Sequence, residues 1–140
     1  MPLTKATTNV VNLDKDTVIN TVRVGLGAGN IGTNTSLGSI NMLNNTTGDY
    51  NTAIGHAAML NNTTGALNTA VGVNTLNINT TGSNNTAVGV NALNLNTTGS
   101  YNTAVGFTAL SANTFANSNT AIGSSALQVN TIGSSNTAVG

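Results

Sequence analysis

The chain has 140 residues and no net charge, and 4% of its residues are charged, against roughly 25% in a typical soluble domain. It has no basic stripe, so the sequence offers no electrostatic surface for nucleic acid or anionic lipid. It contains no cysteine, which excludes disulfides and thiolate chemistry. No apolar stretch approaches the roughly 20 residues that a membrane-spanning helix needs.

Residues 1–24 differ in composition from everything that follows. Five of the six charged residues lie here: Lys5, Asp14, Lys15, Asp16 and Arg23. No apolar segment precedes Asp14, so the opening does not have the pattern of a secretory signal. Specific docking needs varied polar and charged contacts. We therefore expect residues 1–24 to attach the chain to another protein, and ordinary terminal disorder is the rival interpretation.

A glycine-rich segment, residues 25–33, comes next. The run from Gly27 to Gly32 matches the dinucleotide fingerprint G-x-G-x-x-G. That fingerprint needs a helix after it within a βαβ unit. Here a different motif begins immediately, at Asn34. The sequence therefore predicts a glycine-rich turn that leads into the remainder of the chain.

Residues 34–140 consist of repeats of one short unit. The copies begin at Asn34, Asn51, Asn68, Asn85, Asn102, Asn119 and Asn136, and the last reaches only its fifth position, Gly140. Their common sequence is N-T-A-V/I-G-x-x-A-L-x-x-N-T-T-G-x-x, whose positions we number 1 to 17. A fixed short period is typical of stacked-repeat proteins. Because solenoids need terminal caps, we expect further chain to follow Gly140.

Each unit is expected to form two short strands and two turns. The first strand is Asn-Thr-Ala-Val, ended by glycine, and the second is centred on Ala-Leu at positions 8 and 9, before the turn Asn-Thr-Thr-Gly. Two glycines per unit and the lack of a 3.6-residue apolar stripe argue against helix. The fold class is therefore all-β, a parallel β-solenoid or β-roll. Each unit makes one coil, which pairs in register with the next at about 4.8 Å.

The apolar positions predict an inner and an outer face. Neighbouring side chains of a strand point to opposite sides. We expect the large residues at positions 4 and 9 to fill the coil and the adjacent alanines to face outward. Such a narrow coil buries little apolar surface, so we expect other copies of the chain to cover the alanines in a homotrimer. The trimer-packing residues would be Ala53, Ala70, Ala87, Ala104 and Ala121.

Residues 85–106, NTAVGVNALNLNTTGSYNTAVG, resemble the head repeats of trimeric autotransporter adhesins, which form a left-handed parallel β-roll in a threefold fibre. They are more similar still to the Asn-Thr-Ala-Val/Ile-Gly and Asn-Thr-Thr-Gly arrays in tail fibres of tailed phages, particularly phages of cyanobacteria. The likeness covers residues 34–140, and the opening also looks like the start of such fibres. The unit is longer than in most adhesin heads, and the turn at residues 113–117 lacks the second threonine and the glycine.

The resemblance implies a structural virion protein rather than an enzyme. Residues 1–24 would anchor it to the tail or baseplate, residues 34–140 would form the shaft, and a region beyond residue 140 would bind the host receptor. The chain would assemble in the host cytoplasm without a cofactor, nucleic acid or membrane insertion. A bacterial adhesin head is the alternative, but it needs a signal segment. An ice-binding β-solenoid is a further alternative, although the threonines do not follow a Thr-x-Thr pattern.

Few side chains offer chemistry. His56 is the only histidine and the carboxylates are Asp14, Asp16 and Asp49, so no catalytic or metal-binding constellation is predicted. A polysaccharide-cleaving tailspike would need paired carboxylates. His56 is expected to point outward or pack between chains, the alternative being a histidine ring that holds an ion on the threefold axis. Aromatic side chains could pack between chains or stack on glycans; they are Tyr50, Tyr101, Phe107 and Phe115.

Overall fold

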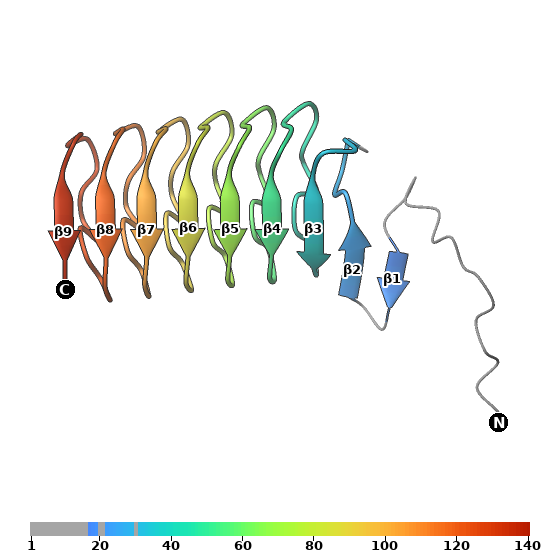
Figure 1. The fold of residues 1–140 in the computed structure, drawn as a ribbon, viewed down its shortest axis with the longest axis horizontal. Helices are drawn as coiled ribbons and strands as arrows, with labels where there is room; N and C mark the ends of the chain where they lie inside the picture. Colours follow the sequence, from blue (N-terminus) through green and yellow to red (C-terminus); the bar gives the residue numbers. More distant parts are fainter. Residues whose placement is uncertain (1–16, 20–21, 30) are drawn as a thin grey trace, which may run out of the picture.

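The computed structural model describes residues 17–19, 22–29 and 31–140, and in these residues nine strands form a single sheet in chain order. Figure 1 shows the repeats as a row of coils, with one strand on the near side of each. The strands are β1 (Thr17–Ile19), β2 (Val22–Gly25), β3 (Thr35–Gly38), β4 (Thr52–Ile54), β5 (Thr69–Val71), β6 (Thr86–Val88), β7 (Thr103–Val105), β8 (Thr120–Ile122) and β9 (Thr137–Val139).

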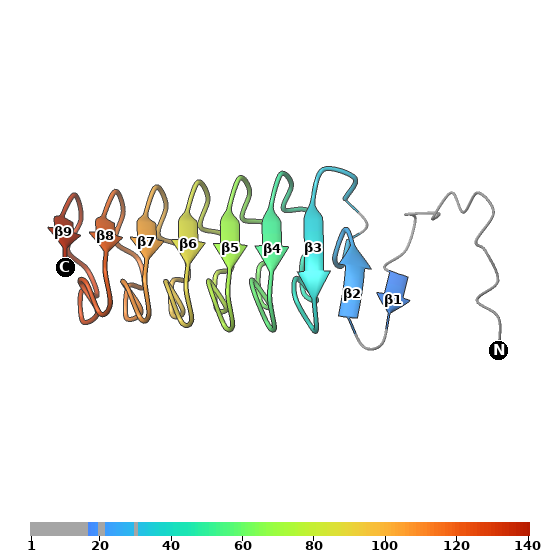
Figure 2. The same ribbon diagram turned by 60° about the horizontal axis from the view of Figure 1, so that its bottom comes forward.

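Strands β3 to β9 are parallel and pair without any shift of the repeat. Thr86 lies opposite Thr103, and Ala87 lies opposite Ala104, so each residue meets its own equivalent in the next copy of the unit. The same register holds in every pair from β3 to β9. Figure 2 shows the coils stacked in one direction. The predicted parallel β-solenoid with one coil per repeat unit is therefore confirmed.

The predicted second strand is wrong. The Ala-Leu segment contains no strand in any described coil, because the residues at positions 7 and 9 adopt left-handed backbone conformations, as at Thr108 (φ 54°) and Leu110 (φ 50°). Such residues turn the chain sharply, which closes a coil within a single short unit. The segment still bonds from coil to coil: the Leu93 amide donates to the Ala109 carbonyl at 3.0 Å. Inter-coil hydrogen bonding therefore continues outside the strands.

The interior holds one column of large apolar side chains rather than two. The column is formed by position 9, as predicted, and its fully buried members are Met42, Met59, Leu76, Leu93 and Leu110. The position 3 alanines of the strands face this column and are also buried. The Val, Ile or Leu at position 4 lies on the outer side, contrary to expectation. A coil this narrow has room for large side chains from one wall only.

Two ladders of buried asparagines occupy the rest of the interior, at positions 1 and 12. In one coil the Nδ2 groups of Asn85 and Asn96 both donate to the Gly99 carbonyl, at 2.9 and 2.8 Å. Between coils, the Asn102 backbone amide donates to Asn85 Oδ1 at 3.0 Å, and Asn96 Nδ2 donates to Asn79 Oδ1 at 2.8 Å. The asparagines therefore close each coil and tie it to its neighbours.

The amino-terminal end of the solenoid is covered by different structure. β1 and β2 form an antiparallel pair, and β2 pairs antiparallel with β3. The following loop lies against the first coil, where the Ala28 amide donates to the Met42 carbonyl at 3.0 Å. A Cβ atom on Gly27 would lie 2.7 Å from Met42 Cβ, so glycine permits this close approach. Among the residues that the structure describes, this segment is followed by β3 and not by a helix, as a structural glycine-rich turn predicts.

Candidate functional site

The predicted attachment residues are mostly beyond the part of the chain that the structure describes. Lys5, Asp14, Lys15 and Asp16 lie outside the described residues. Arg23 belongs to β2, which is paired with β1 and β3. The segment assigned to attachment therefore runs into the sheet, and its limit at residue 24 falls within β2.

The structure contradicts the assignment of the position 3 alanines to trimer packing. These residues face the interior of their own coil and have no exposed surface to offer a second chain: Ala53, Ala70, Ala87, Ala104 and Ala121, each 0% exposed. The assignment followed from placing position 4 inside the coil. Any contact between copies must therefore use other residues.

The outer face of the sheet carries two regular columns, which we call the outer columns. One consists of the position 2 threonines and the other of the position 4 apolar residues, and both are exposed or half-buried. In β6, for example, Thr86 is exposed and Val88 is 36% exposed. The apolar column comprises Leu37, Ile54, Val71, Val88, Val105, Ile122 and Val139. Because the strands are in register, both columns repeat once per coil.

The isolated candidate residues lie on the surface. His56 is exposed, and Asp49 is the only charged residue of the repeats. All four aromatic side chains are more than half exposed: Tyr50, Tyr101, Phe107 and Phe115. None of them is therefore used in the interior of its own coil, and each is available to a neighbouring chain or a ligand.

The described residues contain no group of three His, Cys, Asp or Glu side chains that could hold a metal ion. No helix that is long and apolar enough to cross a membrane occurs among them either.

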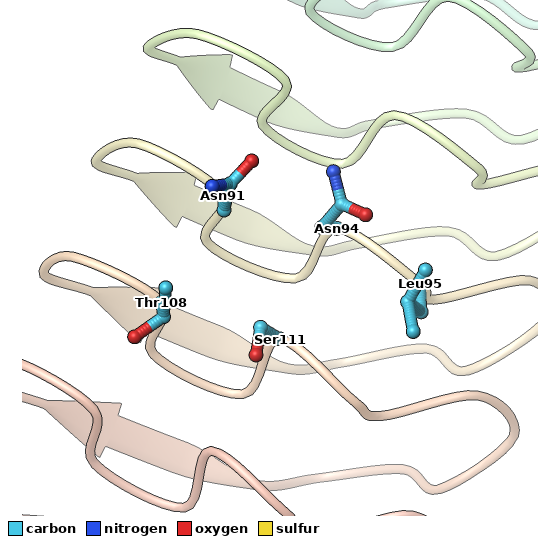
Figure 3. Close-up of a pocket in the computed structure, with 5 residues that line it drawn as sticks. All are labelled: Asn91, Asn94, Leu95, Thr108 and Ser111. Atoms are coloured by element: carbon cyan, nitrogen blue, oxygen red, sulfur yellow. The ribbon is translucent and has the colours of Figure 1, made fainter.

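A surface pocket lies between the coils that contain β6 and β7, on the loops that follow the strands (Figure 3). It is an open hollow of about 270 Å³. Its lining carries no charge and consists of Asn91, Asn94, Leu95, Thr108 and Ser111; although four of these five residues are polar, most of the surface that faces the hollow is apolar. A second hollow lies where β2 meets β3, beside Val24 and Leu37. No pattern in the sequence predicts the first pocket, although Ser111 stands where the two preceding copies have asparagine.

The chain matches no protein-family model, no curated protein and no solved structure.

Proposed function

We propose that this chain is the shaft of a phage tail fibre, a structural virion protein that assembles in the host cytoplasm as a homotrimer of left-handed coils. The resemblance of residues 34–140 to tail-fibre repeats supports this proposal. The architecture supports it too, because seven equivalent strands stacked in register extend a rod. A bacterial adhesin head would use the same rod on a cell surface.

The observation that carries the proposal is the apolar outer column. Leu37, Val88 and Ile122 are 40%, 36% and 43% exposed, and all point from the same face of one sheet. A contiguous exposed apolar surface marks an interaction site. Another copy of the chain presents columns with the same spacing, and with Asp49 as the only charge of the repeats little electrostatic repulsion opposes their approach. We therefore assign trimer contact to the outer columns.

A matched pair of substitutions tests this assignment. Val88→Asp places a charge in the middle of the apolar outer column, whereas Ile78→Asp places one at position 11, on the loop side; both native residues are 36% exposed. Analytical ultracentrifugation should find the Val88→Asp chain as a monomer with its β-sheet circular dichroism retained, and the Ile78→Asp chain as a trimer. A wild-type chain that is monomeric at micromolar concentration would contradict the homotrimer.

The attachment function of residues 1–24 follows from the composition of that segment, which holds five of the six charges. In the proposed fibre these residues bind the tail or baseplate, and a region beyond residue 140 binds the host receptor. A reconstruction of the virion tests both assignments. Contacts of a tail protein with the repeats and none with residues 1–24 would overturn the attachment assignment.

One structural observation favours a second candidate function, ice binding. The outer columns place one hydroxyl and one apolar side chain on every strand of a regular parallel sheet, with a rise of roughly 4.8 Å per strand. Regular hydroxyl and methyl groups on a rigid surface can order water into a lattice. Thermal hysteresis and ice shaping by the purified chain would support this function. A trimer that buries the outer columns and shows no hysteresis would exclude it.

A further inference from the structure

The loops between the coils contain a recurring hydrogen bond, which we call the position 10 bridge. Asn77 Nδ2 donates to the Ala57 carbonyl at 2.8 Å, and Asn94 Nδ2 donates to the Asn74 carbonyl at 2.8 Å. In both cases an asparagine at position 10 reaches back to the position 7 carbonyl of the preceding coil. The bridge therefore ties two neighbouring coils together.

The bridge is absent at the next coil, because position 10 there is Ser111. The serine side chain is too short to reach the carbonyl of Asn91, and among the described residues no donor bonds to this oxygen. The repeated backbone geometry directs the Asn91 carbonyl toward Ser111, as the Asn74 carbonyl is directed toward Asn94. The pocket of Figure 3 lies at this point. The hollow therefore coincides with the coil in which serine replaces the asparagine of the two preceding coils.

The polar groups of this pocket have unused hydrogen-bonding capacity. Besides the Asn91 carbonyl, the Asn91 side-chain amide and the Ser111 hydroxyl make no hydrogen bond within the described residues. The Thr108 hydroxyl lies 3.0 Å from that of Ser125, and Leu95, 42% exposed, supplies apolar surface. Donors and acceptors beside an apolar wall match a sugar ring, which has hydroxyl groups at its edge and C–H groups on its face.

We propose that this pocket is a binding subsite for one neutral sugar ring, a hexose or N-acetylhexosamine unit of a surface polysaccharide. The volume of about 270 Å³ is slightly below the usual range of ligand pockets, roughly 300–1,000 Å³, which suits one ring and not an oligosaccharide. The ligand is neutral because no charged residue lines the pocket, and Asp49 is the only charged residue of the repeats. A subsite this small and open binds weakly, on the order of millimolar.

The relevance of this subsite to a host surface depends on the proposed function. In a trimeric fibre, three copies of the pocket would point outward in three directions around the axis, and weak single contacts with the chains of a surface polysaccharide would combine into useful avidity. Positions 7, 10 and 11 form the pocket, whereas trimer contact is assigned to positions 2 and 4. Binding of sugar to the isolated chain and assembly of the trimer can therefore fail independently of each other.

The repeat itself supplies the test variant. Ser111→Asn introduces the residue that two other coils carry at position 10, so it should restore the bridge to Asn91 and fill the pocket without unfolding the coil. Adding Asn94→Ser opens the preceding bridge and should move the pocket one coil toward the amino terminus, beside Asn74. Circular dichroism and the trimer mass verify that both variants remain folded and assembled.

Binding is measured by ¹H–¹⁵N NMR titration of the full chain with glucose, galactose, mannose and N-acetylglucosamine, with glucuronate and glycerol as controls. We expect saturable shifts of the Asn91 and Ser111 amide signals with at least one neutral sugar. Affinity should fall at least tenfold in Ser111→Asn, and in the double variant the shifts should move to Asn74. The proposal is overturned if no neutral sugar shifts these signals, if glycerol or glucuronate shifts them equally, or if Ser111→Asn binds like the wild type.

Discussion

Ala87 and Val88 are consecutive residues of β6, yet Ala87 is completely buried inside the coil and Val88 is 36% exposed on its outer face. The smaller residue is inside because the buried Leu93, on the opposite wall of the same coil, already fills the space. The larger residue is left on the surface. This relationship determines which substitutions damage the coil and which affect only its contacts.

We predict that Ala87→Leu destabilises the coil by about 1–3 kcal/mol, since a packed interior does not accommodate three extra carbon atoms without strain. The control, Val90→Leu, enlarges a side chain of the same coil that is 41% exposed and belongs to neither outer column, so it should change the free energy of unfolding by less than about 0.5 kcal/mol. Urea unfolding followed by circular dichroism measures both. Equal stability of the two variants would place Ala87 outside the interior.

The same reasoning revises the expected effect of charged substitutions. Ala87→Arg should unfold the coil itself, because it would bury an unpaired guanidinium. Its effect would therefore go beyond separating the copies of a trimer. Ser83→Arg, at a half-buried turn position, should be tolerated. Far-UV circular dichroism of the two variants distinguishes loss of the fold from loss of assembly.

The period of the sequence was sufficient to predict the solenoid. Repetition of Asn-Thr-Ala-Val/Ile-Gly at a fixed interval requires equivalent residues to stack, and the parallel register of Ala87 with Ala104 follows. The period does not predict which face of a strand lies inside the coil. Alternation divides the side chains between two faces but does not say which of the two is buried. Alternation also fails around Leu93, whose left-handed backbone lets both Ala92 and Leu93 face the interior.

The asparagine ladders are present in the sequence, but local patterns interpret position 1 as the start of a strand and position 12 as a turn residue. Asparagine occurs at position 1 of every copy and at position 12 of every copy that reaches it, and such invariance exceeds what a turn needs. The sugar pocket depends on a finer feature, the change from Asn94 to Ser111 at one variable position. The structural effect of this change can be inferred only once the hydrogen bond from Asn94 to the Asn74 carbonyl is known.

We predict that Asn85→Ala costs about 2 kcal/mol, because it leaves the buried backbone amide of Asn102 without its acceptor, Asn85 Oδ1. The adjacent Asn84 provides the control. Its side chain makes no hydrogen bond within the described residues and its φ of 58° suits glycine, so Asn84→Gly should change stability by about 0.5 kcal/mol or less. Chemical unfolding compares them, and a cost of Asn84→Gly equal to that of Asn85→Ala would argue against the ladder.

Backbone strain at the turns gives a stabilising prediction. Ile40 has a φ of 53°, a conformation that is unfavourable for a β-branched residue, and asparagine occupies the equivalent position in Asn74 and Asn91. Ile40→Asn should therefore raise the free energy of unfolding by about 1 kcal/mol. Ile78→Asn is the control, because Ile78 has nearly the same exposure, 36% against 37%, without a left-handed backbone. Stabilisation by both changes, or by neither, would contradict the assigned strain.

The last prediction concerns position 15, where one copy carries Ala116 in place of glycine. Beyond this alanine the second asparagine ladder stretches: Asn130 Nδ2 lies 3.5 Å from Asn113 Oδ1, whereas Asn113 Nδ2 lies 2.8 Å from Asn96 Oδ1. A Cβ atom pointing at the next coil accounts for this difference, since at the equivalent Gly65 it would collide with the Gly82 carbonyl oxygen.

Gly65→Ala should therefore weaken the bond between Asn79 and Asn62, now 2.7 Å, and destabilise the coil by about 2 kcal/mol. Gly32→Ala is the control, because a Cβ atom there meets no atom within 4 Å and should be neutral or slightly stabilising. Thermal unfolding gives the stability, and amide hydrogen exchange at Asn79 and Thr80 should accelerate in Gly65→Ala alone. Unchanged exchange in that variant would show that the coils accept alanine at position 15 without separating.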